Sequence, residues 1–150
     1  MSSQDQSFLT FLQDQGAVWT PSANPPELGT VPLDPGSIGN AELSEWLGKC
    51  TAWLSYAHSQ LGLAEAQRAL LQRRFSRIAN ELIVSKQVKQ RTYDLQLAEV
   101  ARDREDLLRL QEELADLEAK IALWSRMARA YETYVTLFSK EAEARRWRRE

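Results

Sequence analysis

The sequence has no proline after residue 35 and no glycine after residue 62. These two residue types interrupt helices. The stretch from Leu63 to Glu150 contains neither of them. Apolar residues recur there at alternating three- and four-residue spacing, which is typical of long helices packed as a coiled coil. We therefore predict an all-α fold: a long antiparallel helical hairpin or coiled coil, oligomeric, with an irregular proline-rich N-terminal arm.

Cysteine and histidine occur only once each, as Cys50 and His58. A single cysteine forms no intramolecular disulfide, which excludes a secreted disulfide scaffold. Cys50 lies on the apolar face of a predicted helix, so we expect a buried thiol. No apolar run approaches the roughly 20 residues of a membrane span, and residues 1–15 lack the pattern of a signal peptide. We expect a cytoplasmic protein with no membrane association.

No set of residues suited to catalysis is recognisable. His58 has no cysteine or histidine at helical spacing, so it lacks the convergent partners that a metal site or a general base needs. The glycines at 29, 36 and 39 sit among prolines rather than in a phosphate-binding loop between a strand and a helix. The acidic pairs Glu105–Asp106 and Glu112–Glu113 fall on the polar face of a predicted helix. We therefore expect a protein that is not an enzyme and holds no metal or cofactor.

Residues 1–39 form the predicted arm. A short amphipathic helix is expected at residues 4–15, where Phe8 and Phe11 lie on one side and Gly16 follows. The proline spacing between residues 16 and 40 blocks helix continuation and favours extended or turn conformations. Two interpretations stay open for this arm. It is either a flexible tail, or a docking element that packs Phe8, Phe11 and Trp19 on a neighbouring subunit or partner.

The domain at 40–150 begins with a predicted helix over residues 40–84. Asn40 is suited to cap its start, and Glu42 favours the positive end of the helix dipole. One apolar face repeats with steps of four and three, and Arg68 is its single polar member. The face consists of Leu43, Leu47, Cys50, Leu54, Ala57, Leu61, Ala64, Arg68, Leu71, Phe75, Ile78 and Leu82.

A turn is predicted at residues 85–92, where the apolar pattern is lost, although no glycine or proline marks it; one continuous helix is the alternative. The second helix is predicted over residues 93–147. Its repeat is close to 3.5 residues, which predicts a left-handed supercoil. Its face consists of Val100, Asp103, Leu107, Leu110, Leu114, Leu117, Ile121, Trp124, Ala128, Tyr131, Val135, Phe138 and Ala142.

The net charge of −2 hides four blocks of alternating sign. Residues 1–67 and 94–118 are acidic, whereas residues 68–91 and 119–150 are basic. A folded hairpin gathers the first basic block around the predicted turn, and nucleic-acid phosphates bind such surfaces through counterion release. Nearby Tyr93 is suited to stack on a base. The candidate nucleic-acid contacts are Arg73, Arg74, Arg77, Lys86, Lys89 and Arg91.

Three stretches together resemble phage recombination mediators of the UvsY type, over residues 42–146. They are Ser44-Glu45-Trp46-Leu47-Gly48-Lys49, Glu65-Ala66-Gln67-Arg68, and the aromatic stretch from Leu123-Trp124 to Phe138-Ser139, which basic Arg145-Arg146 follows. The resemblance implies a small oligomeric helical protein that binds single-stranded DNA, displaces single-strand-binding protein and helps to load a RecA-like recombinase. If a phage encodes it, we expect the protein in the cytoplasm of the host cell.

Two other hypotheses remain open. The chain is alternatively a coiled-coil scaffold or adaptor that binds a protein partner without nucleic acid. The third hypothesis is a regulator that binds a cellular machine and uses the acidic stretch 94–118 as a nucleic-acid mimic. Aromatic residues beyond a single stripe predict contacts with a further subunit or partner. The candidate contacts are Phe8, Phe11, Trp19, Trp46, Trp53, Trp124 and Tyr134.

Overall fold

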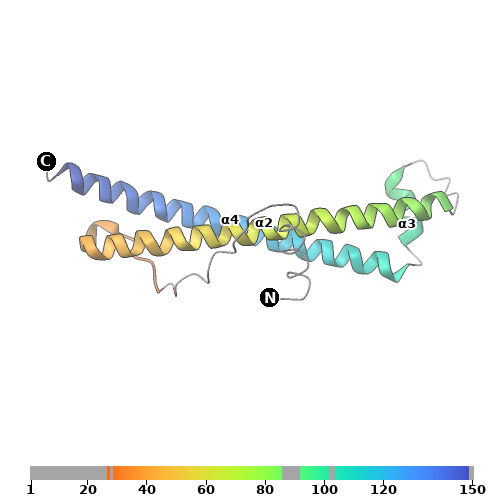
Figure 1. Cartoon of the computed structure of the whole chain (residues 1–150), viewed down its shortest axis with the longest axis horizontal. Coiled ribbons are helices and arrows are strands. Elements are labelled where there is room, and N and C mark those ends of the chain that lie inside the picture. Colours follow the sequence, from red (N-terminus) through yellow and green to blue (C-terminus); the bar gives the residue numbers. More distant parts are fainter. Residues whose placement is uncertain (1–26, 28, 86–91, 102–103, 149–150) are drawn as a thin grey trace, which may run out of the picture. The chain divides into compact units, whose positions relative to one another are not determined.

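The computed structural model describes residues 27, 29–85, 92–101 and 104–148 (Figure 1). These residues form a 3₁₀ helix η1 (Pro35–Ser37) and three α-helices, α2 (Asn40–Ser85), α3 (Tyr93–Ala101) and α4 (Glu105–Trp147). The described part of the chain contains no strand, so the predicted all-α class is confirmed. None of the helices in these residues combines the length and apolarity that crossing a membrane requires.

The apolar faces predicted from the spacing are the faces that the helices bury. On α2, every predicted face residue is buried or half-buried except Arg68, which is exposed. On α4, every predicted face residue from Leu107 to Ala142 is buried or half-buried. Burial of this stripe is the main source of stability for such helices, because isolated helices are marginal in water.

Several predictions fall outside the described residues. These are the amphipathic helix at residues 4–15, the face residue Asp103, and most of the predicted turn, residues 86–91. On either side of the turn, α2 ends at Ser85 and α3 begins at Tyr93.

The chain divides into two compact units, and each is described here by itself. Unit 1 comprises Met1–Leu61 with Leu123–Glu150, and unit 2 comprises Gly62–Ala122. In unit 1, Leu43 and Cys50 of α2 pack on Phe138 of α4 in one cluster, while Ala57 packs on Ala128 in another. Residues early in α2 therefore meet residues late in α4, so the two helices run in opposite directions within this unit.

The end of the N-terminal arm packs on the helices of unit 1. Val31 and Ile38 join the cluster around Leu43 and Phe138, and Pro35 is buried. Between them, the Asp34 side chain accepts a hydrogen bond from the Gly36 backbone N–H at 2.9 Å and caps η1. Val31, Pro35 and Ile38 thus pack on the helices of unit 1, whereas Leu33 between them is exposed.

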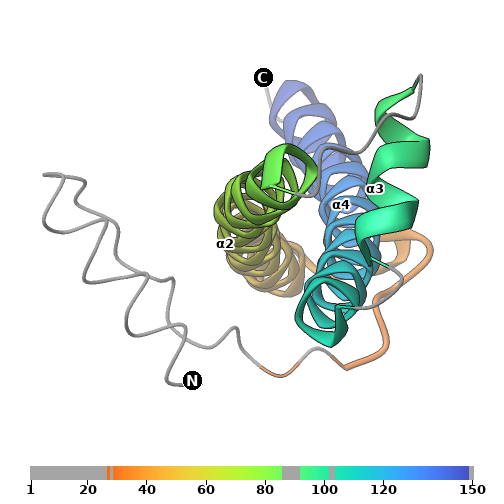
Figure 2. The same cartoon turned by 90° about the vertical axis from the view of Figure 1, so that its right-hand side faces the viewer.

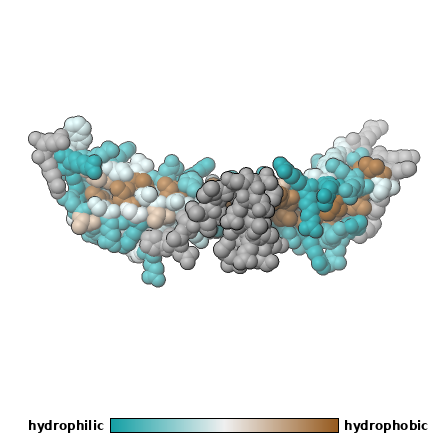
Figure 3. All heavy atoms as spheres, viewed as in Figure 1, coloured by the Kyte–Doolittle hydropathy of each residue, from teal (hydrophilic) through white to brown (hydrophobic). Residues whose placement is uncertain are grey.

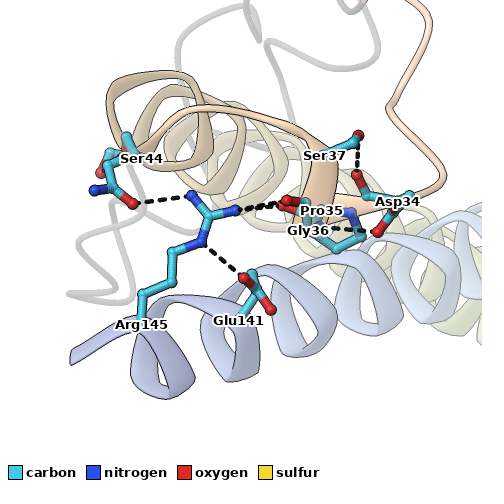
Figure 4. Close-up of polar contacts among 8 residues, drawn as sticks. Asp34, Pro35, Gly36, Ser37, Ser44, Glu141 and Arg145 are labelled. Atoms are coloured by element: carbon cyan, nitrogen blue, oxygen red, sulfur yellow. Dashed lines mark hydrogen bonds and ion pairs between the residues drawn. The ribbon is translucent and has the colours of Figure 1, made fainter. Parts of the chain in front are cut away.

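Arg145 joins this arm to the C-terminal part of α4 (Figure 4). Its Nε donates to Glu141 Oε1 at 2.7 Å, and its Nη1 donates to Asn40 Oδ1 at 2.9 Å. Its Nη2 donates to the carbonyl oxygens of Pro35 at 2.8 Å and Gly36 at 3.4 Å. One guanidinium therefore links α4, the start of α2 and η1, as its fork of donors allows.

The Arg145 contact corrects the predicted role of Asn40. Asn40 is the first residue of α2, and its side-chain oxygen accepts from Arg145. The first helical turn instead includes a bond from the Leu43 N–H to the Gly39 carbonyl at 2.8 Å. A charged donor forms a stronger hydrogen bond than a backbone amide, which accounts for the orientation of the Asn40 side chain.

Replacing Arg145 by alanine should lower the free energy of unfolding by about 2 kcal/mol, because hydrogen bonds to a charged group contribute about 1.5–3 kcal/mol. Urea denaturation followed by circular dichroism measures the loss. Arg146→Ala is the matched control, because Arg146 is exposed and should change stability by less than about 0.5 kcal/mol. Equal effects of the two substitutions would contradict the linking role of Arg145.

In unit 2, α3 and α4 pack on the same stretch of α2. Phe75 of α2 is buried with Ala101 of α3 and with Leu107 and Leu110 of α4. Leu97 of α3 packs against this cluster, and Figure 2 shows α3 beside α4. The cluster thus combines three helical segments rather than two.

The second predicted helix is corrected by this arrangement. The sequence predicts one helix over residues 93–147, whereas α3 ends at Ala101 and α4 begins at Glu105. Arg104 precedes α4, its carbonyl accepts from the N–H groups of Leu107 and Leu108, and its side chain bonds Asp106 at 2.8 and 2.6 Å. This hydrogen bond lowers the pKa of the Asp106 carboxyl. A run of five charged residues, 102–106, offers no apolar side chain to hold a continuous helix on the core.

Cys50 is fully buried beside Leu43 and Phe138, as the sequence predicts. Burial raises the pKa of its thiol, which leaves little reactive thiolate at neutral pH. We expect a disulfide reagent to modify Cys50 on the order of 10³-fold more slowly in the native protein than in urea, because reaction requires transient unfolding. A native rate equal to the rate in urea would contradict this packing.

Candidate nucleic-acid interface

Arginines of α2 form the most concentrated basic surface in the described part of unit 2. Arg73, Arg74 and Arg77 are exposed, and they surround the buried Phe75 in the sequence. Each residue turns an α-helix by about 100°. Arg73 and Arg77, each two positions from Phe75, therefore lie about 200° around the helix from the core. The requirement to bury Phe75 accordingly turns these guanidinium groups toward solvent.

These arginines carry charge that the described chain does not neutralise. The described ion pairs join Lys49 to Glu45, Arg104 to Asp106, Arg109 to Glu105 and Arg145 to Glu141. Arg68, Arg73, Arg74 and Arg77 make no ion pair with any residue that the structure describes. Unpaired guanidinium groups keep their full capacity to bind phosphate oxygens.

A shallow hollow of about 430 Å³ lies on the same stretch of α2. Its lining includes the basic residues Arg68 and Arg73, the carboxylate Glu65 and the exposed amide Gln72. The combination offers guanidinium and amide donors on a solvent-open surface. An extended polar chain fits such a surface better than an enclosed small molecule does, because ligand sites for small molecules bury most of their ligand.

Tyr93 and three basic residues complete the predicted interface. Tyr93, at the first position of α3, is 47% exposed, so its ring is open to a stacking partner. Lys86, Lys89 and Arg91 lie outside the described residues, between Ser85 and Thr92 in the sequence. Phe75 is core, as expected.

The aromatic residues predicted as subunit contacts pack inside unit 1. Trp46 and Tyr134 pack against the cluster of Leu43 and Phe138, and Trp53 and Trp124 pack against the cluster of Ala57 and Tyr131. All four are half-buried. Contacts within the chain therefore already cover much of their apolar area, so a second chain is not required to bury them. Phe8, Phe11 and Trp19 lie outside the described residues.

Trp53 and Trp124 belong to a row of four aromatic rings, which the sequence indicates only in part. Trp53 stacks on Tyr131 with ring centres 5.4 Å apart, and Tyr56 meets both Trp53 and Trp124 edge to face at 5.8 and 5.6 Å. Tyr56 was not predicted, because it lies off the heptad face. Its spacing of three from Trp53 places the two rings on neighbouring turns, which is the signal that identifies it.

The remaining polar candidates are dispersed. His58 is exposed, and among the described residues no three histidine, cysteine, aspartate or glutamate side chains lie together as metal ligands would. Arg146 and Arg148 are exposed near the end of α4, while Arg145 is used in the contact with η1.

Comparison with protein-family models, with curated proteins and with solved structures found no match to this chain. The resemblance to UvsY-type mediators therefore rests on the three sequence stretches quoted above.

Proposed function

We propose that this chain is a non-enzymatic helical protein that binds single-stranded DNA and acts as a recombination mediator, assisting the loading of a RecA-like recombinase. In this proposal α2 and the helices that follow form a long antiparallel hairpin, and the protein works in the cytoplasm as a homo-oligomer. One observation carries the proposal. The exposed arginines of α2 are not neutralised by any carboxylate among the described residues.

The kind of surface supports binding to a single strand rather than to a duplex. The described residues offer guanidinium groups for phosphates and the exposed Tyr93 ring for a base. Proteins that bind single strands without sequence preference combine a basic track with stacking aromatic side chains. The basic residues Lys86, Lys89 and Arg91 adjoin Tyr93 in the sequence and extend this set.

The test is fluorescence anisotropy with a labelled single-stranded oligonucleotide at several salt concentrations, with the duplex of the same sequence as comparison. We expect binding at low salt that weakens steeply as salt rises, with a log–log slope of about −0.7 for each phosphate contact. Absence of binding at low salt would contradict the proposal.

A protein-binding scaffold is the second candidate, and exposed leucines favour it. In unit 1, Leu123 and Leu137 of α4 are exposed, and Leu137 borders a hollow of about 600 Å³ with Arg129, Thr133 and Lys140. Figure 3 shows hydrophobic residues reaching the surface of both units between hydrophilic ones. Exposed apolar patches mark protein contacts. A scaffold predicts that charge reversal on α2 leaves function intact, whereas Leu123→Ser with Leu137→Ser abolishes partner binding.

A further inference from the structure

Two rows of charged residues in unit 2 have the same spacing and opposite signs. On α2, Arg73, Arg77 and Glu81 follow one another at intervals of four, with signs plus, plus and minus. On α4, Glu112, Asp116 and Lys120 follow one another at the same intervals, with signs minus, minus and plus. All six side chains are exposed, and none forms an ion pair with another described residue.

The two rows cannot pair within one copy of unit 2. Phe75 of α2 and Leu110 of α4 are buried in the same cluster, so these sides of the two helices face each other. Arg73 and Arg77 each lie two residues from Phe75, and Glu112 lies two residues from Leu110, which places all three about 200° from the shared core. Arg73 and Arg77 thus point away from Glu112, on opposite sides of the unit.

Residues at intervals of four form the ridges through which helices most commonly pack. If α2 of one copy lies parallel to α4 of another, each charged residue of one row meets a residue of opposite sign. Exposed apolar residues extend both rows at helical spacing. Leu70 lies three residues before Arg73, Val84 three residues after Glu81, and Leu108 four residues before Glu112. The charge pattern and the exposed apolar side chains of the two rows are therefore both complementary to a second copy of this chain.

We propose that the acidic row Glu112–Asp116–Lys120 of one copy docks on the basic row Arg73–Arg77–Glu81 of another. Because the two rows are different surfaces, the contact is heterologous and repeats from copy to copy. The inference rests on the proposed function in one respect: DNA and the acidic row use the same arginines, so they compete. Single-stranded DNA should then displace the acidic row from these arginines, and the docked acidic row should limit access to DNA.

The first test measures assembly without DNA, by sedimentation velocity of the full chain at low and moderate salt. The wild type should self-associate at low salt, and on the order of tenfold more weakly at moderate salt, because exposed ion pairs are screened. The variants Arg73→Glu/Arg77→Glu and Glu112→Arg/Asp116→Arg should each stay monomeric, because each brings like charges together. An equimolar mixture of the two should associate again, because the reversed rows are complementary to each other.

Circular dichroism should show that both variants keep their helices, because all four substituted side chains are exposed. The inference is overturned if the wild type is monomeric at low salt, if either variant associates like the wild type, or if mixing restores nothing.

The second test uses the neutral variant Glu112→Gln/Asp116→Asn and anisotropy with the labelled oligonucleotide. Removing the competing row should tighten DNA binding several-fold at equal salt, whereas unchanged affinity would overturn the competition. The two proposals fail separately. Charge-dependent assembly without DNA binding overturns the proposed function alone, and DNA binding by a protein that shows no charge-dependent assembly overturns the docking of the rows alone.

Discussion

Reversing three charges on α2, by Arg73→Glu, Arg74→Glu and Arg77→Glu, should reduce affinity for single-stranded DNA on the order of 100-fold at low salt. Each exposed arginine is available to one phosphate, and a glutamate in its place repels that phosphate. The loss of three contacts should also lower the steepness of the salt dependence by about 2 log units per log unit of salt. Helix content should be unchanged, because all three side chains are exposed.

The control makes the same change in net charge elsewhere. Arg126, Arg129 and Lys140 of α4 are exposed, belong to unit 1 and form no ion pair with a described residue. Their replacement by glutamate should weaken binding only through the overall charge. The loss of affinity should be about one tenth of the loss in the α2 variant, and the salt slope should stay nearly unchanged. If both variants lose the same affinity and slope, binding depends on net charge and the interface is not on α2.

Phe138→Ala should cost about 3–5 kcal/mol of unfolding free energy, the largest single-residue effect that we expect. Phe138 is fully buried in a cluster with Leu43 and Cys50 of α2, and its removal leaves a cavity where α4 meets the first part of α2. Total stability of a domain is often only about 5–15 kcal/mol, so the variant should be partly unfolded near body temperature. Urea denaturation followed by circular dichroism measures this change.

Leu137→Ala is the control for Phe138, because Leu137 is the adjacent residue and is 39% exposed. It should cost less than about 1 kcal/mol, since much of its surface remains in water in the folded state. Equal costs at the two positions would show that α4 does not bury the face that contains Phe138.

The sequence predicts which faces of the helices are buried because a single physical requirement determines them. Apolar residues at steps of three and four must leave water together, and this holds from Leu43 to Leu82 on α2 apart from Arg68. The burial of Cys50 and Phe75 follows from the same periodicity. The exposure of Arg73, Arg74 and Arg77 follows in turn, because residues on the other sides of the helix remain in solvent.

Contacts between distant residues were not predictable in this way. Arg145 and Pro35 are 110 positions apart, and their hydrogen bond depends on where the arm crosses the helices. The sequence indicated Arg145 only as one of the basic residues that follow the aromatic stretch of the second helix. The separation of α3 from α4 before Glu105 was likewise not predicted. Both helices pack on Phe75, and these tertiary contacts, rather than the local sequence, decide against one continuous helix.

Photo-crosslinking would show whether α2 contacts single-stranded DNA. A bromodeoxyuridine-substituted single strand is irradiated with the full chain at low salt, and crosslinked peptides are identified by mass spectrometry. We expect crosslinks in peptides from the part of α2 that contains Arg68 to Arg77 and in the peptide that contains Tyr93. Crosslinks confined to α4, or none at all, would contradict it.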